Sequence, residues 1–93
     1  MRFLPGPPTF AAEVQSENDY GAVAEAEMEA RRADYFEAGT VVVWDVDPVN
    51  EVIRKYRWDS PDRAEIFIRG QQADAEPAVP GWKVAVDGLF AVP

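Results

Sequence analysis

Polar and apolar residues alternate over residues 9–16, the first patterned stretch of the chain. In an extended strand, successive side chains point to opposite faces. The apolar face would comprise Phe10, Ala12 and Val14, and the polar face Thr9, Ala11, Glu13 and Gln15. The pattern therefore predicts a short strand whose apolar face meets the core. Glu13 is then most simply a solvated charge on the other face.

A helix is predicted over residues 18–38, where strong helix formers dominate and proline is absent. Asn18 or Asp19 is the expected N-cap, and Gly39 is the residue expected just past the C-terminus. At 100° per residue one narrow stripe should face the core, and Glu25, Glu27 and Glu29 should form a solvated face. The stripe contains Ala24, Met28, Tyr35 and Ala38, with Arg31 in its middle.

The residues that follow read as strands. The run at 40–46 is β-branched and aromatic, with no polar alternation until Asp45, which is typical of a strand covered on both faces. Asp47-Pro48 predicts a turn, 51–58 a half-exposed antiparallel strand, and 59–63 a second turn. A further strand is expected at 64–70, a loop at 71–80, and a short extended segment or a helical turn at 81–90.

The order strand, helix, strand predicts a right-handed crossover that joins two parallel strands. The fold class is therefore α/β, or α+β if the later antiparallel strands are given more weight. Open α/β sheets bind ligands beyond the carboxyl ends of their strands. This rule places Glu13 and the N-terminal half of the helix near a candidate site.

Composition excludes several classes of function. The 93 residues suffice for one domain, and the net charge of −8 opposes non-specific binding to a phosphate backbone. Without cysteine or histidine the chain has no thiolate nucleophile and no zinc ligands of the usual kind. We expect a soluble, cytoplasmic protein without a targeting segment, because no apolar run approaches the roughly 18 residues of a membrane span.

Carboxylate chemistry remains possible. The sequence has neither a glycine-rich phosphate loop nor a nucleophile elbow. Glu13, then Gln15 two positions later on the same face, and Arg31 from the helix make a group that could hold a divalent ion and orient water on a phosphodiester. The simpler interpretation gives Arg31 a stem that covers the core while its charge reaches solvent, and makes Gln15 an ordinary polar strand residue.

Three stretches resemble blocks of the Uma-two family of restriction endonucleases, which have the PD-(D/E)XK nuclease-like fold. "PPTFAAEVQSENDYG" is similar to "vEVxSpsD", "EARRADYFEAGTVVVWDVDP" to "KxxxYxxaGvxxvWxvDP", and "PAVPGWKVAVDGLF" to "LPGfxlxlxxLF". They occur in the family's order and spacing over nearly the whole chain. The resemblance implies one partial domain over residues 1–93, with a restriction-endonuclease-like mixed sheet, one long crossover helix, and an N-terminal truncation.

The resemblance also implies an activity, magnesium- or manganese-dependent cleavage of DNA. The family's metal-binding glutamate falls on Glu13, its general lysine position on Gln15, and the lysine that this family carries on its helix falls on Arg31. Arginine binds phosphate but stays protonated and does not readily serve as the base that activates water. The family's first metal-binding aspartate lies in an upstream hairpin that has no counterpart here. We therefore expect Glu13 to be a partial metal site and the activity to be lost or impaired.

A second hypothesis belongs to a different class of function. A sheet that begins at Thr9 exposes an edge on which the missing strands would pair. The chain would then be a non-catalytic interaction module that forms a homo-oligomer, or that binds a second chain to complete the sheet.

Overall fold

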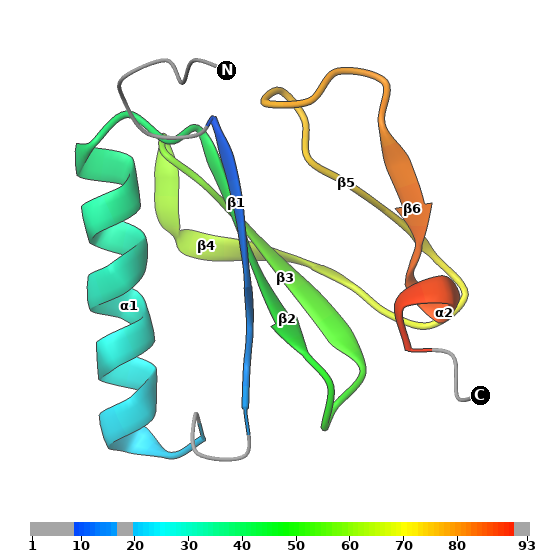
Figure 1. The fold of residues 1–93 in the computed structure, drawn as a ribbon, viewed down its shortest axis with the longest axis horizontal. Coiled ribbons are helices and arrows are strands. Elements are labelled where there is room, and N and C mark those ends of the chain that lie inside the picture. Colours follow the sequence, from blue (N-terminus) through cyan, green and yellow to red (C-terminus); the bar gives the residue numbers. More distant parts are fainter. Residues whose placement is uncertain (1–8, 17–19, 91–93) are drawn as a thin grey trace, which may run out of the picture.

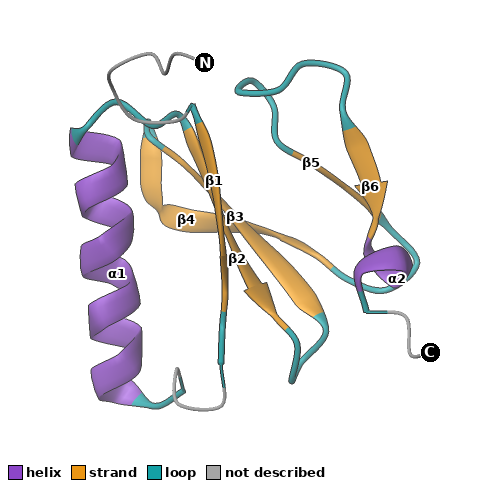
Figure 2. Ribbon diagram, viewed as in Figure 1, coloured by secondary structure: helices purple, strands orange, loops and turns teal. Residues whose placement is uncertain are grey.

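The computed structural model describes residues 9–16 and 20–90 of the chain (Figure 1). A sheet separates one long helix from a small C-terminal layer of a hairpin and a helical turn (Figure 2). The elements are β1 (Phe10–Val14), α1 (Ala22–Glu37), β2 (Val42–Asp47), β3 (Val52–Arg57), β4 (Ser60–Phe67), β5 (Gln72–Asp74), β6 (Lys83–Ala85) and α2 (Val86–Leu89).

The main sheet has the order β1-β2-β3-β4, and β5 pairs with β6 in a separate hairpin. β1 runs parallel to β2, with Phe10 opposite Val42 and Val14 opposite Val46. The β2–β3 and β3–β4 pairs are antiparallel. Since α1 connects the two parallel strands, the predicted mixed α/β architecture with one long crossover helix is confirmed.

β2 is one of the two interior strands of the main sheet, and all six of its residues are buried. Three of its apolar side chains, Val42, Trp44 and Val46, belong to a core cluster that also contains Ile53 of β3, Phe67 of β4 and, from the C-terminal layer, Ala73 and Val86. The strand ends at Asp47, whose carboxylate accepts hydrogen bonds from the backbone amides of Val49 and Asn50. The prediction of a buried strand followed by a turn is therefore confirmed.

The C-terminal end of α1 follows the sequence expectation, but its start does not. Gly39 has φ 107°, which suits glycine, and its amide donates to the Phe36 carbonyl at 3.0 Å. The next amide, that of Thr40, donates to the Tyr35 carbonyl, and this pair of bonds is a Schellman motif. The helix begins at Ala22, after an N-cap at Gly21 without a side-chain cap. The expected caps, Asn18 and Asp19, lie outside the described residues.

Two expected irregular segments contain strands. Residues 60–63, predicted as part of a turn, belong to β4, and the turn itself is formed by Trp58 and Asp59. β4 is an edge strand, which tolerates Pro61 because one side of its backbone needs no partner. Gln72–Asp74, predicted as loop, is β5, because pairing with β6 orders it. The segment at 81–90 contains both of the expected alternatives, a short strand and a helical turn.

The two faces of β1 are the reverse of the prediction. Ala11 is 9% exposed and Gln15 4% exposed, and they lie on the side covered by α1. Val14 is 65% exposed, and Ala12 is also exposed. The polar face is buried because the crossover helix packs on it, whereas the apolar face lines an open groove.

Candidate functional site

A layer of polar side chains fills the space between α1 and the helix-facing side of the sheet. We call it the polar layer. It consists of Glu13, Gln15, Tyr20, Arg31, Arg32, Tyr35, Asp45, Asp47, Arg54 and Tyr56.

Two strands contribute its carboxylates. Glu13 of β1 lies directly opposite Asp45 of β2 in the parallel register, so both point to the same face. Asp47 follows two residues later on that face of β2. The fold thus brings three carboxylates together, where the sequence analysis expected one.

Arg32 neutralises Asp45, one of the two buried carboxylates. Its Nη1 donates to Asp45 Oδ2, and the two side chains are 10% and 4% exposed. The guanidinium also lies 3.9 Å from the centre of the Tyr56 ring, a cation–π contact. Burial raises the pKa of Asp45, and the charge and hydrogen bond of Arg32 oppose that rise. Among the described residues, Arg32 Nε has no hydrogen-bond partner.

Arg31 occupies a different place from the one predicted. The helix turns Arg32 toward the sheet, so Arg31 lies beside the buried stripe and its side chain is 49% exposed. Its Nε is 4.0 Å from Glu13 Oε1, so the expected approach of these two residues does occur. Ala24 and Met28 are buried as predicted, but Ala38 is exposed beyond the helix end.

Glu13 lies opposite the C-terminal half of α1, not the N-terminal half. The Tyr35 hydroxyl donates to Glu13 Oε1 at 3.2 Å. The charge of Glu13, together with partial burial, raises the pKa of Tyr35. Glu13 therefore has both a cation and a hydroxyl donor beside one oxygen.

Gln15 is held by contacts on both ends of its amide. Its Nε2 donates to Met28 Sδ at 3.4 Å, and its Oε1 accepts from Arg54 Nη1 at 3.4 Å. The side chain lies inside the polar layer and is almost fully buried. It thus occupies the face that was expected to carry the candidate chemistry, but as a buried amide.

Asp47 accepts more hydrogen bonds than the other two carboxylates of the polar layer. It accepts hydrogen bonds from the Tyr20 hydroxyl at 2.6 Å, from Arg54 at 3.0 Å and from the Asn50 side chain at 2.8 Å. Burial alone would raise the pKa of Asp47, but the hydrogen bonds from Tyr20, Asn50 and Arg54 outweigh it and hold the pKa well below its usual value. This carboxylate therefore stays ionised.

The family resemblance implies magnesium, and the donors of the polar layer do not fit it. Magnesium prefers carboxylate oxygens, waters and substrate phosphates in an octahedron. Here Asp45 is paired with Arg32, Asp47 with Arg54, and Glu13 with Arg31. A divalent cation would have to displace an arginine to gain a ligand. Within residues 9–16 and 20–90, no group of three or more carboxylates is arranged to hold a metal ion.

Sequence reasoning missed the pair of Arg32 and Asp45. One signal was available, because Asp45 interrupts an otherwise apolar buried strand, and a buried carboxylate requires a partner. The helix stripe offered the partner, since Arg32 stands four residues after Met28. Arg54 and Tyr20 carried no comparable signal in the sequence. Both bind Asp47 at the end of β2, and only the folded chain brings them there.

The fold and the polar layer define a mixed α/β domain in which a crossover helix covers a carboxylate-bearing face of the sheet. The chain belongs to the Uma2 family, described as "Putative restriction endonuclease", whose family model matches residues 1–87. This membership agrees with the resemblance that the sequence blocks indicated.

A solved structure supports the same fold. The chain is similar to a protein of Anabaena variabilis described as "a putative nuclease belonging to DUF820", with a TM-score of 0.72 and 17% sequence identity. The match covers 92% of this chain and 45% of the other, so the chain spans less than half the length of that relative. A search of curated proteins finds no match. In the part of the chain that the structure describes, no helix is long and apolar enough to cross a membrane.

Proposed function

We propose that this chain is a nuclease-family domain whose own polar layer does not bind the divalent cation that DNA cleavage would need, so that hydrolysis is lost or strongly impaired. One observation carries the proposal, namely that each of the three carboxylates is paired with an arginine. DNA is the substrate that family membership suggests. The net charge of −8 weakens any general attraction to it.

The pairs differ in how strongly they oppose a metal ion. Asp45 and Asp47 are 4% and 1% exposed, so removing their arginines would leave a buried charge. Glu13 is 32% exposed, and its arginine is at the limit of an ion pair. Glu13 is therefore the only carboxylate of the three that a cation could reach, and one carboxylate is a poor magnesium site.

Cleavage of supercoiled plasmid in magnesium or manganese tests the proposal. We expect no cleavage that depends on Glu13, so that the unaltered chain, Glu13→Ala and the exposed-helix control Glu29→Ala should all behave alike. Arg31→Lys installs the lysine that the resemblance implies, and we expect it to confer no cleavage because Asp45 stays paired with Arg32. Metal-dependent cleavage by the unaltered chain that Glu13→Ala abolishes and Glu29→Ala retains would overturn the proposal.

Thermal unfolding gives a second test that does not require activity. A cation that binds the folded chain raises the melting temperature by mass action. We expect calcium and manganese to have the same effect on the melting temperature of the unaltered chain and of Glu13→Gln. A rise that disappears in this variant would mean that the polar layer accepts a metal ion.

A further inference from the structure

The two edges of the main sheet differ in their protection against pairing. β4, at one edge, carries Pro61 and charged side chains, including Arg63 and Glu65, which discourage the addition of another strand. β1, at the other edge, has the sequence FAAEV, with neither proline nor lysine. Its only charge is Glu13, which lies on the helix-facing side. Of the two edge strands in the described part of the chain, β1 is therefore the one less protected against a partner.

The backbone of β1 shows which groups are available. The Gln15 amide donates to β2 at 2.9 Å, and the Thr9 carbonyl accepts from β2 at 3.2 Å. Backbone groups of alternate residues in a strand point to opposite sides. Phe10, Ala12 and Val14 therefore direct their N–H and C=O groups to the outer edge, where no described strand pairs with them.

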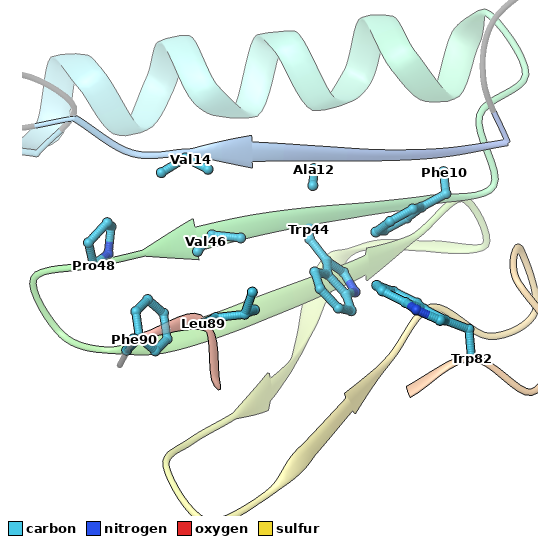
Figure 3. Close-up of a pocket in the computed structure, with 9 residues that line it drawn as sticks. All are labelled: Phe10, Ala12, Val14, Trp44, Val46, Pro48, Trp82, Leu89 and Phe90. Atoms are coloured by element: carbon cyan, nitrogen blue, oxygen red, sulfur yellow. The ribbon is translucent and has the colours of Figure 1, made fainter. Parts of the chain in front are cut away.

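The same three residues present apolar side chains to an open groove of about 390 Å³ (Figure 3). Trp44 and Trp82 stack at one end of it, with ring centres 5.3 Å apart, and Phe10 meets Trp44 edge-on at 5.1 Å. The lining residues are Phe10, Ala12, Val14, Trp44, Val46, Pro48, Trp82, Leu89 and Phe90. Val14 and Leu89 are 65% and 45% exposed. The open backbone edge and the apolar surface are thus continuous.

We propose that two copies of this chain associate through β1, in an antiparallel pair with Ala12 on the two-fold axis. In this register Ala12 pairs with Ala12 of the second copy, and Phe10 pairs with Val14. All three outward-facing residues of each copy then form hydrogen-bonded pairs, which gives six backbone hydrogen bonds. The result is one continuous sheet of eight strands.

The register is self-complementary, and this favours a second copy as the partner. Glu13 lies opposite Ala11 of the other copy, so the two carboxylates do not meet, whereas a register centred on Glu13 would oppose them. The two-fold axis is perpendicular to the sheet, so both apolar grooves lie on the same face and meet across the interface. An isologous contact of this kind closes after two copies.

The net charge of −8 on each copy adds a long-range repulsion. Because salt screens this repulsion, the dimer should become stronger as ionic strength rises. Binding to nucleic acid would show the opposite dependence. Association through β1 does not depend on whether the polar layer binds a metal ion.

Analytical ultracentrifugation from about 1 to about 200 µM tests the interface, because mass action makes association depend on concentration. We expect the unaltered chain to convert from monomer to dimer. Val14→Lys should raise the dissociation constant on the order of 100-fold, because it affects both halves of a symmetric contact. The matched control is Val23→Lys, a change of the same kind at a residue of α1 that is 75% exposed, and it should leave the constant unchanged.

Ala12→Pro provides a second variant, since it removes only an amide that points away from β2. It should also abolish the dimer. An unaltered chain that stays monomeric over the whole range overturns the proposal. So does a dimer that survives both Val14→Lys and Ala12→Pro.

Hydrogen exchange identifies the edge directly. At high concentration we expect slower exchange at the amides of Phe10, Ala12 and Val14 and no change at Ala11 and Glu13, which point toward β2 at any concentration. A concentration-dependent change without this alternation would place the contact elsewhere and overturn the register.

Discussion

The buried pair of Arg32 and Asp45 predicts a large and specific loss of stability in Arg32→Met. Methionine is also a long, unbranched side chain, but it lacks the guanidinium that lies over the Tyr56 ring and that pairs with Asp45, which is 4% exposed. Breaking a buried pair from one side costs about 3–5 kcal/mol. Arg54 still acts on Asp45 from β3, so we expect the lower end, about 3 kcal/mol.

Urea unfolding followed by tryptophan fluorescence at pH 7 measures this loss. Arg31→Met is the matched control, because Arg31 is adjacent in sequence to Arg32 but is 49% exposed and forms only a 4.0 Å contact with Glu13. We expect that change to cost less than about 1 kcal/mol. In a double-mutant cycle with Asp45→Asn, the double variant should lose less than the two single variants together, by at least about 2 kcal/mol.

The loss of stability in Arg32→Met should also depend on pH. Burial raises the pKa of Asp45 in the folded chain, and loss of Arg32 raises it further. A raised folded pKa favours folding at low pH, and that advantage is lost as pH rises through it. The difference between Arg32→Met and the unaltered chain should therefore narrow as pH falls toward 4. A cost for Arg31→Met as large as that for Arg32→Met, or a cost for Arg32→Met under about 1 kcal/mol, would refute the role of the pair.

Two other predictions concern single positions. Asp47→Asn removes a carboxylate that is 1% exposed and has a depressed pKa, so we expect a loss of about 2–4 kcal/mol at pH 7. The stability that a depressed pKa contributes is fully present above the ordinary value of 3.8 and is lost as pH falls below it, so the difference between Asp47→Asn and the unaltered chain should shrink there. Urea unfolding from pH 7 to pH 2.5 measures this difference, and a difference that stays constant would contradict the prediction. Gly39→Ala places a side chain at φ 107° and should lower stability by about 1–2 kcal/mol, measured by thermal unfolding. Gly88→Ala, where an added Cβ meets open space, should change it by less than about 0.5 kcal/mol, and equal effects at the two glycines would contradict the assignment.

The elements with strong local signals could be read from the sequence. The run before Asp45 is apolar on both faces, so it indicated a central strand, and β2 is fully buried. Gly39 indicated the helix end, because few other residues adopt its backbone conformation, and the Schellman motif is present. The extent of β4 was not predictable in this way, since pairing with β3 overrides the local turn preference there.

The candidate site was predictable in part. Glu13, Gln15 and Arg31 do lie on the helix-facing side or at its border, but the sequence placed the wrong arginine in the centre of the stripe. A helical stripe read at 100° per residue fixes neighbours only to within about one position, because the packing angle of the helix on the sheet decides which side chain is central. Arg32 is central here, and its charge is balanced by Asp45, a residue far enough along the chain that no local pattern joins the two.

The sequence by itself determined the order of elements, the buried central strand and family membership, because these depend on local periodicity and on motifs in a fixed order. Only the tertiary structure decided which face of β1 is buried. Alternation separates the two faces of a strand but does not say which one a helix covers, and here the crossover helix supplies arginine and tyrosine partners that make burial of the polar face favourable. The apolar face of β1 consequently lines the groove at an edge of the described sheet.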